Sequence, residues 1–247
     1  KLLDLSEKEN RELINNILSR KDISHRELFG NINNIISNEI LEKLSILKSE
    51  LFESHEFNIL SEDKELLKAL SLLIFCSPLW EKVLIKIRKN LLMKYSEDSD
   101  LNKNILNFTI SLGSQCFLNE YIYYISEEEK IKLEKLKNSI NSNKNQDYEL
   151  ALISCYQSLS SINENIINLN SYYSRNKEFN KLVDLQFKET IIEQSISSKI
   201  KKLGNISDLI SKQVKNQYES NPYPRWRYNL YAKEKKIHFL SVINSEI

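Results

Sequence analysis

Glycine and proline are both scarce in this chain, since each occurs only three times in 247 residues. These residues are the usual breakers of helices, and apolar residues recur here at spacings of three and four. We therefore predict an all-α fold, a multi-helix array or bundle that ends in an extended, proline-rich segment. A degenerate tetratricopeptide-like array is an open alternative, although no fixed repeat of about 34 residues recurs.

The few glycines also limit the chemistry open to the chain. Gly30, Gly113 and Gly204 stand far apart, so none of them belongs to a glycine-rich loop of the kind that cradles a phosphate or a dinucleotide. We therefore expect this chain by itself to bind no cofactor, neither a nucleotide nor S-adenosylmethionine, and we assign it no catalytic residue.

Cysteine and histidine are scarce as well, with three of each. Cys76, Cys116 and Cys155 each lie in an apolar run, and no two of them form a Cys-x-x-Cys pair. The histidines are scattered in the same way: His25, His55 and His238. We interpret the cysteines as buried thiols of a protein in a reducing cytoplasm, and we predict no metal site.

Neither a large net charge nor a long apolar run is present. Thirty-five basic residues stand against thirty-four acidic ones, a net charge of +1. No overall field therefore draws the chain to nucleic acid or to an anionic membrane. The longest apolar run, 70–80, is interrupted by Ser71, Ser77 and Pro78, and it is far shorter than the ~20 residues of a transmembrane helix. We predict a soluble, cytoplasmic protein whose partners are neither nucleic acid nor membrane.

Helix signals recur along most of the sequence. Capping-box patterns at Ser6, Ser24 and Ser126, and Pro78 as a first-turn residue, mark helix starts. We predict helices over about 6–19, 24–47 with a break near Gly30, 61–75, 78–91, 101–121, 126–137, 148–168 and 179–202, followed by a short helix from 205. The polar stretch 138–147 is the predicted linker. It separates an N-terminal helical subdomain (1–137) from a second helical segment (148–215), which a Pro/Tyr/Trp-rich junction (216–247) follows.

A polar group interrupts the most apolar predicted helix. Gln115 and Asn119 are four residues apart and would share one helix face, and Glu120 and Tyr121 follow directly. Buried amides need hydrogen-bond partners. Backbone groups of a neighbouring segment would give the pair a structural role, whereas a ligand or another domain would give it a binding role, and the sequence leaves both open.

The most unusual stretch lies near the end of the chain. Two of the three prolines, Pro222 and Pro224, restrict the backbone of 221–225 to extended geometry. The stretch therefore presents its large side chains with little conformational freedom left to lose. Its predicted docking residues are Tyr218, Glu219, Asn221, Pro222, Tyr223, Pro224, Arg225 and Trp226. Tyr, Trp and Arg are the usual anchors of protein interfaces, so we predict docking against another domain; packing within this domain and base stacking on nucleic acid are the alternatives.

Two motifs resemble one known family. The run 217–226, Gln-Tyr-Glu-Ser-Asn-Pro-Tyr-Pro-Arg-Trp, resembles the Q-Y-E-x-N-P-Y-P-R-W signature of bacterial S-adenosylmethionine-dependent methyltransferases that carry a helical, often tetratricopeptide-containing N-terminal region. The run 115–121, Gln-Cys-Phe-Leu-Asn-Glu-Tyr, is similar to a segment that these proteins carry about a hundred residues earlier. The first motif is highly specific and the second moderately so.

The resemblance implies an N-terminal region whose partners are its own catalytic domain and a protein substrate. In the family a Rossmann-like domain with a glycine-rich cofactor loop follows the signature, but this chain stops at Ile247 before any such loop. S-adenosylmethionine would therefore belong to the parent protein, and the role of the 115–121 motif stays unassigned. The rival hypothesis is a non-enzymatic helical scaffold that binds a partner protein.

Overall fold

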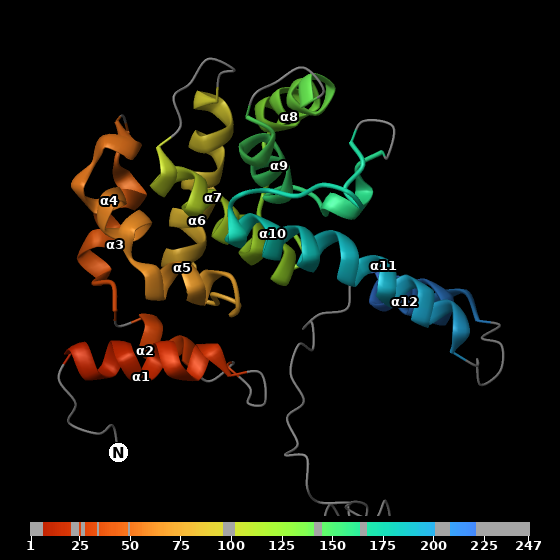
Figure 1. Ribbon diagram of the computed structural model, residues 1–247, viewed down its shortest axis with the longest axis horizontal. Helices are drawn as coiled ribbons and strands as arrows, with labels where there is room; N and C mark the ends of the chain where they lie inside the picture. The colour runs from red at the N-terminus through yellow and green to blue at the C-terminus, as the bar shows by residue number, and fades with distance from the viewer. Residues whose placement is uncertain are drawn as a thin grey trace, which may run out of the picture.

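The computed structural model describes residues 7–20, 25, 28–33, 35–48, 50–95, 102–140, 145–163, 167–200 and 208–220. Within these ranges the protein contains helices and no strand, which confirms the all-α prediction. The helices are stacked side by side into a multi-helix array (Figure 1).

The elements follow one another along the chain, and the connection from η4 to α10 covers residues 162–176. The α-helices are α1 (Glu7–Ser19), α2 (Phe29–Asn33), α3 (Asn38–Ile46), α4 (His55–Glu62), α5 (Lys64–Leu70), α6 (Pro78–Lys94), α7 (Lys103–Leu118), α8 (Glu127–Ser139), α9 (Gln146–Ser154), α10 (Lys177–Val183), α11 (Glu189–Lys199) and α12 (Leu209–Ser220). The structure also contains the 3₁₀ turns η2 (Leu51–Glu53) and η4 (Leu159–Ser161) and the π-helical turn η5 (Asp184–Lys188).

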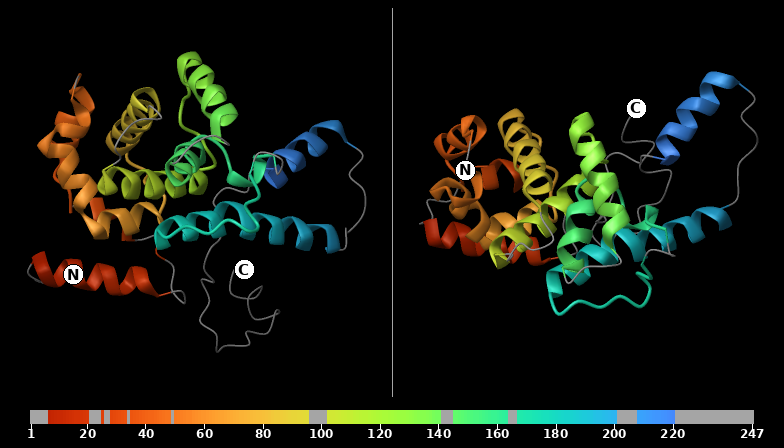
Figure 2. Two further views of the ribbon diagram at one scale, coloured as in Figure 1. Left: turned by 45° about the horizontal axis from the view of Figure 1, so that its top comes forward. Right: turned by 90° about the horizontal axis from the view of Figure 1, so that it is seen from above.

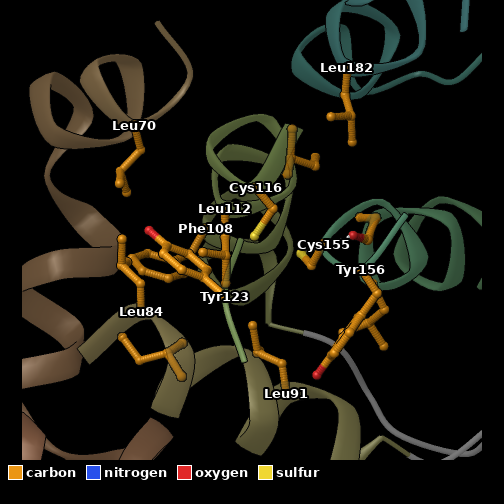
Figure 3. Close-up of a cluster of buried hydrophobic side chains, with 14 of the residues drawn as sticks. Leu70, Leu84, Leu91, Phe108, Leu112, Cys116, Tyr123, Cys155, Tyr156 and Leu182 are labelled. Carbon is orange, nitrogen blue, oxygen red and sulfur yellow. Dashed lines mark hydrogen bonds between the residues drawn. The ribbon is translucent and has the colours of Figure 1, made fainter. Parts of the chain in front are cut away.

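Helix α7 is the centre of the array. Every residue from Phe108 to Leu118 is buried, and α7 packs against α4, α5, α6, α9 and α10. Figure 3 shows Phe108, Leu112 and Cys116 of α7 among core side chains of neighbouring helices, including Leu84 and Leu91. A helix that is apolar on all sides is stable only inside a protein, so α7 organises the others around it.

The closest helix contact is between α7 and α9. A Cβ atom placed on Gly113 would lie 2.0 Å from Ser154 Oγ and 3.2 Å from Ser154 Cβ. The absence of a side chain at Gly113 therefore lets the two helices approach. Buried residues before and after the 138–147 stretch belong to the same hydrophobic core.

The buried side chain of Gln186 in η5 forms hydrogen bonds to α7 and α9 where these two helices meet. Its Nε2 donates to Gly113 O at 2.8 Å and to Ser154 O at 3.2 Å, and its Oε1 accepts from Leu159 N at 3.2 Å. The π-helical turn η5, which carries Gln186, lies between α10 and α11. Such turns re-aim side chains within a helix, and this one inserts an amide between α7 and α9.

Local signals at two helix starts are confirmed, whereas the predicted starts at Ser6 and Ser24 lie outside the described residues. Ser126 and Glu129 form a reciprocal capping box at α8, and Pro78 occupies the first turn of α6. The helix predicted over 61–75 is wrong in its start, because Ser61 lies inside α4 and Asp63 Oδ1 caps α5 by accepting from Leu66 N at 2.9 Å.

Two predicted long helices are shorter in the structure. The element expected over 24–47 is divided into α2 and α3 near Gly30, as predicted, although Gly30 itself lies within α2. Ser37 starts α3 instead, since its side chain accepts from Ile40 N. The helix expected over 148–168 ends at Ser154, because Ser158 bonds to Gln186 O at 2.8 Å and turns the chain toward η5.

The cysteines divide into two environments. Cys116 and Cys155 are buried, as expected, whereas Cys76 is exposed. The prediction of a buried thiol at Cys76 is therefore wrong: it lies in the non-helical connection between α5 and α6, where its apolar neighbours Leu73 and Phe75 are buried and it points outward.

Candidate docking surfaces

Gln115 lies at the C-terminal end of α7 and is fully buried. In the amide orientation that satisfies both ends, Nε2 donates to Leu73 O at 2.6 Å and Leu70 O at 3.3 Å, while Oε1 accepts from Phe75 N at 3.3 Å. These backbone groups belong to the last residue of α5 and to the connection that follows it. Gln115 thus holds the α5–α6 connection against α7 through three hydrogen bonds.

Asn119 caps α7, and its N–H donates to Gln115 O at 3.1 Å, which closes the last turn of the helix. The Glu120 N–H donates to Phe117 O at 3.2 Å and the Tyr121 N–H to Cys116 O at 2.8 Å, the two bonds of a Schellman motif. Asn119 Oδ1 also accepts from Tyr121 N at 3.1 Å. The motif residues 115–121 therefore end one helix and reverse the chain.

This turn stores backbone strain. Glu120 and Tyr121 both have φ of 57°, a conformation that suits glycine and that costs other residues of order 1–3 kcal/mol each. The residues that follow alternate in exposure. Tyr123 is buried, whereas Ile122 and Tyr124 are 66% and 74% exposed. The strained turn consequently presents one aliphatic and one aromatic side chain to solvent.

A buried ion pair anchors the turn to the core. Arg88 of α6 donates to Tyr124 O and lies 3.4 Å from Glu129 Oε1. Its guanidinium is 4.4 Å from the centre of the Tyr156 ring, whose hydroxyl donates to Glu129 Oε1 at 2.8 Å. Although burial by itself would raise the pKa of the Glu129 carboxyl, hydrogen bonds from Ser126 and Tyr156 and the Arg88 charge lower it below its usual value.

The helical spacing of Arg88 in the sequence indicates that it is buried, although a basic residue is not expected in a core. Arg88 is four residues after Leu84 and three before Leu91, so helical periodicity places it on the buried face of α6. A basic residue is normally assigned to the surface, and the partner that makes its burial tolerable, Glu129, is visible only as a helix cap.

The exposed side chains of the 119–124 turn form the first candidate surface. The second is the pair α11 and α12, which project beyond the other helices at one end of the molecule (Figures 1 and 2). No residue of α11 is buried. Ile192, Ile196 and Ile200 follow helical spacing and are 57%, 53% and 64% exposed. On α12, Ile210 and Val214 are likewise exposed. Both helices thus carry an unburied apolar stripe.

The predicted docking residues lie at or beyond the end of α12. Tyr218 and Glu219 are in its last turn, so the short helix predicted to lead into this stretch is present. The others lie outside the described residues: Asn221, Pro222, Tyr223, Pro224, Arg225 and Trp226. Their extended conformation therefore stays a prediction.

The described residues hold no group of three or more His, Cys, Asp or Glu side chains that could bind a metal ion. None of the helices in the described ranges has the length and apolar character needed to cross a membrane. No protein-family model matches the chain, and no curated protein or solved structure is significantly similar to it.

Proposed function

We propose that this chain is the helical, substrate-recruiting or regulatory region of a bacterial S-adenosylmethionine-dependent methyltransferase that acts on proteins. The observation that carries the proposal is the unburied apolar stripe of α11 and α12, which leads directly into the 217–226 signature. The methyltransferase assignment itself rests on the resemblance of the two motifs.

The exposed helices support a docking role on energetic grounds. Isolated helices of fewer than about 12–15 residues are marginal in water, and most helical stability in proteins comes from burial of an apolar face. α12 spans 12 residues. α11 is the continuation of α10 and η5, but neither it nor α12 has its apolar stripe covered by the rest of this chain's described part. A catalytic domain that packs on Ile192, Ile196 and Val214 would supply that burial.

In this proposal the methyl donor and the reacting groups belong to the catalytic domain. Pro222 and Pro224 would direct the chain toward that domain, and Tyr223, Arg225 and Trp226 would contact it. The helical array would then recruit the protein substrate or regulate access to it.

The test compares this chain with the full-length protein encoded by its gene. We expect methyl transfer from labelled S-adenosylmethionine by the full-length protein and none by this chain. In hydrogen exchange, α11 amides should be protected in the full-length protein and should exchange quickly in this chain. Ile196→Glu should remove the protection, whereas Ser198→Glu, which adds the same charge on the opposite side of α11, should preserve it.

The alternative is a non-enzymatic scaffold that docks a separate partner protein through the same stripes. A gene that encodes no methyltransferase domain would favour this alternative and refute the first proposal. Equal exchange rates of α11 in both proteins would refute a catalytic-domain contact at this surface.

A further inference from the structure

A cleft of about 860 Å³ lies between α1, α5, α7 and the segment that joins α10 to α11. This volume is within the range of roughly 300–1,000 Å³ that is typical of ligand sites. Its apolar lining comes from each of these elements: Leu18, Leu67, Leu72, Ile110, Leu182 and Leu185. The cleft is separate from the strained turn at 119–124 and from the apolar stripes of α11 and α12.

Helix α1 forms one wall of the cleft, and two basic side chains, Lys68 of α5 and Arg11 of α1, bind it to the neighbouring helix. Lys68 of α5 donates to Asn15 Oδ1 at 2.6 Å, to the Asn15 carbonyl at 3.0 Å and to Ser19 Oγ at 2.6 Å. Arg11 of α1 pairs with Asp63 at 2.7 Å. All three ammonium protons of Lys68 are thereby used, so this lysine positions the wall.

A chain of hydrogen bonds orients Asn107 on the cleft floor. Asn176 Oδ1 accepts from Glu178 N at 3.0 Å and Phe179 N at 3.4 Å, so its Nδ2 is the end that meets Asn107. That Nδ2 donates to Asn107 Oδ1 at 3.2 Å. The Nδ2 group of Asn107 is consequently the end left to donate, and it makes no hydrogen bond to any described residue.

The side-chain amide of Asn15 has the same orientation as that of Asn107, with its oxygen already bonded. Lys68 occupies its Oδ1, which leaves Nδ2 as the end without a partner among the described residues. Both amides line the cleft, so the site offers donors whose acceptor ends are already fixed.

Ser111 adds a third donor. It lies one turn after Asn107 on α7, lines the cleft and is 6% exposed. Its hydroxyl has no hydrogen-bond partner within the described part of the chain. The hydroxyl is not sealed inside the protein, so an acceptor bound in the cleft can replace water as its hydrogen-bond partner.

We propose that this cleft binds a peptide in extended conformation, whose carbonyl oxygens accept from Asn107 Nδ2 and Ser111 Oγ. Residues four apart on a helix are separated by about 6 Å along the axis. Carbonyls on the same side of an extended chain repeat every two residues, about 6.6 Å. The two donors therefore match the backbone repeat of an extended peptide.

The charges of the cleft also fit a peptide. Among the described residues, its lining contains equal numbers of basic and acidic side chains: Arg20, Lys64, Lys68 and Lys181, and Glu65, Glu178, Asp184 and Glu189. A polyanion such as nucleic acid needs an excess of positive charge, which this lining lacks. Lys68 is used within the chain and Lys181 pairs with Glu178, so the uncharged backbone of a peptide suits the lining. The inference goes beyond the methyltransferase assignment and does not depend on it, because binding is measured on this chain alone.

The test begins with a phage-displayed library of random dodecapeptides selected on the purified chain. Enriched sequences are synthesised with a fluorescent label, and their Kd is measured by anisotropy. Asn107→Asp keeps the shape and the Oδ1 acceptor but replaces the donor by an oxygen, so we expect binding about tenfold weaker. Ser111→Ala should weaken it about fivefold.

Asn168→Asp is the matched control, since it adds the same charge at an exposed residue outside the cleft lining and should leave Kd unchanged. Thermal unfolding checks that each variant is folded. If Asn107→Asp does not fold, the Kd of Ser111→Ala tests the proposal by itself. A library without enriched sequences would overturn the proposal. Enriched peptides that bind the cleft variants as tightly as they bind the wild-type chain would overturn it as well.

Discussion

Replacing Gly113 by alanine should destabilise the protein, although alanine is the better helix former. In a solvent-exposed helix the change would stabilise by about 0.8–1 kcal/mol. Here the added methyl group would lie 2.0 Å from Ser154 Oγ and 3.2 Å from Ser154 Cβ. Rotation of the hydroxyl relieves only the first contact, and it breaks the bond from Ser154 Oγ to Ala151 O, which is 2.6 Å long.

The expected magnitude follows from these opposing effects. Overpacking of a well-packed core costs about 1–3 kcal/mol, and the lost buried hydrogen bond costs about 1 kcal/mol. After the gain in helix propensity, Gly113→Ala should lower the free energy of unfolding by about 1–3 kcal/mol. Denaturation in urea, followed by far-UV circular dichroism, measures this quantity.

A double-mutant cycle tests whether Ser154 is the cause. Ser154→Ala removes the clashing oxygen, so Gly113→Ala should cost about 1 kcal/mol less in that background than in the wild type. Gly30→Ala is the control, because a Cβ there meets nothing within 4 Å; it should stabilise the protein slightly. A Gly113→Ala protein as stable as the wild type, or one that Ser154→Ala does not improve, would refute the reasoning.

Three further predictions follow from other parts of the structure. The native pKa of Glu129 is lowered, so its contribution to stability is present above the unfolded pKa of about 4.3 and is lost as the pH falls through the native pKa. Between pH 7 and pH 3 the wild type should therefore lose more unfolding free energy than Glu129→Gln. Equal losses in the two proteins would contradict this. Glu120→Gly should raise the unfolding free energy by about 1 kcal/mol because it relieves the φ of 57°, while Glu120→Ala should not. Ile196→Glu should change the stability of this chain by less than about 0.5 kcal/mol, because Ile196 is exposed; a larger loss in urea denaturation would show that α11 packs within the array.

The parts of the fold that were predictable depend on neighbours in sequence. The capping box at Ser126 and the first-turn Pro78 form within one helical turn, and apolar periodicity was enough to identify α6 and α7. A break near Gly30 was predicted, but its exact position was not, since that glycine lies inside a helix and Ser37 makes the decisive cap. Local propensity identifies a possible break, but packing decides which one is used.

The candidate surfaces were predictable to different extents. Gln115 and Asn119 were singled out because amides are unusual in an apolar helix, but their partners, the carbonyl of Leu73 and the N–H of Tyr121, became evident only in the structure. The isoleucine stripe of α11 has the same spacing as a core helix, so the sequence did not show that it is exposed. The donors of the cleft were hidden among many asparagines.

The sequence by itself determined that the chain is helical, because scarce breakers, caps and apolar spacing act over one or two turns of the backbone. It also marked the two motifs by their composition. Only the tertiary structure decided that Gly113 lets α7 meet α9, that Arg88 is buried against Glu129, and which apolar stripe stays uncovered. Those outcomes depend on atoms that are distant along the chain and come together only when the helices pack, and no local pattern encodes which helix face will find a partner.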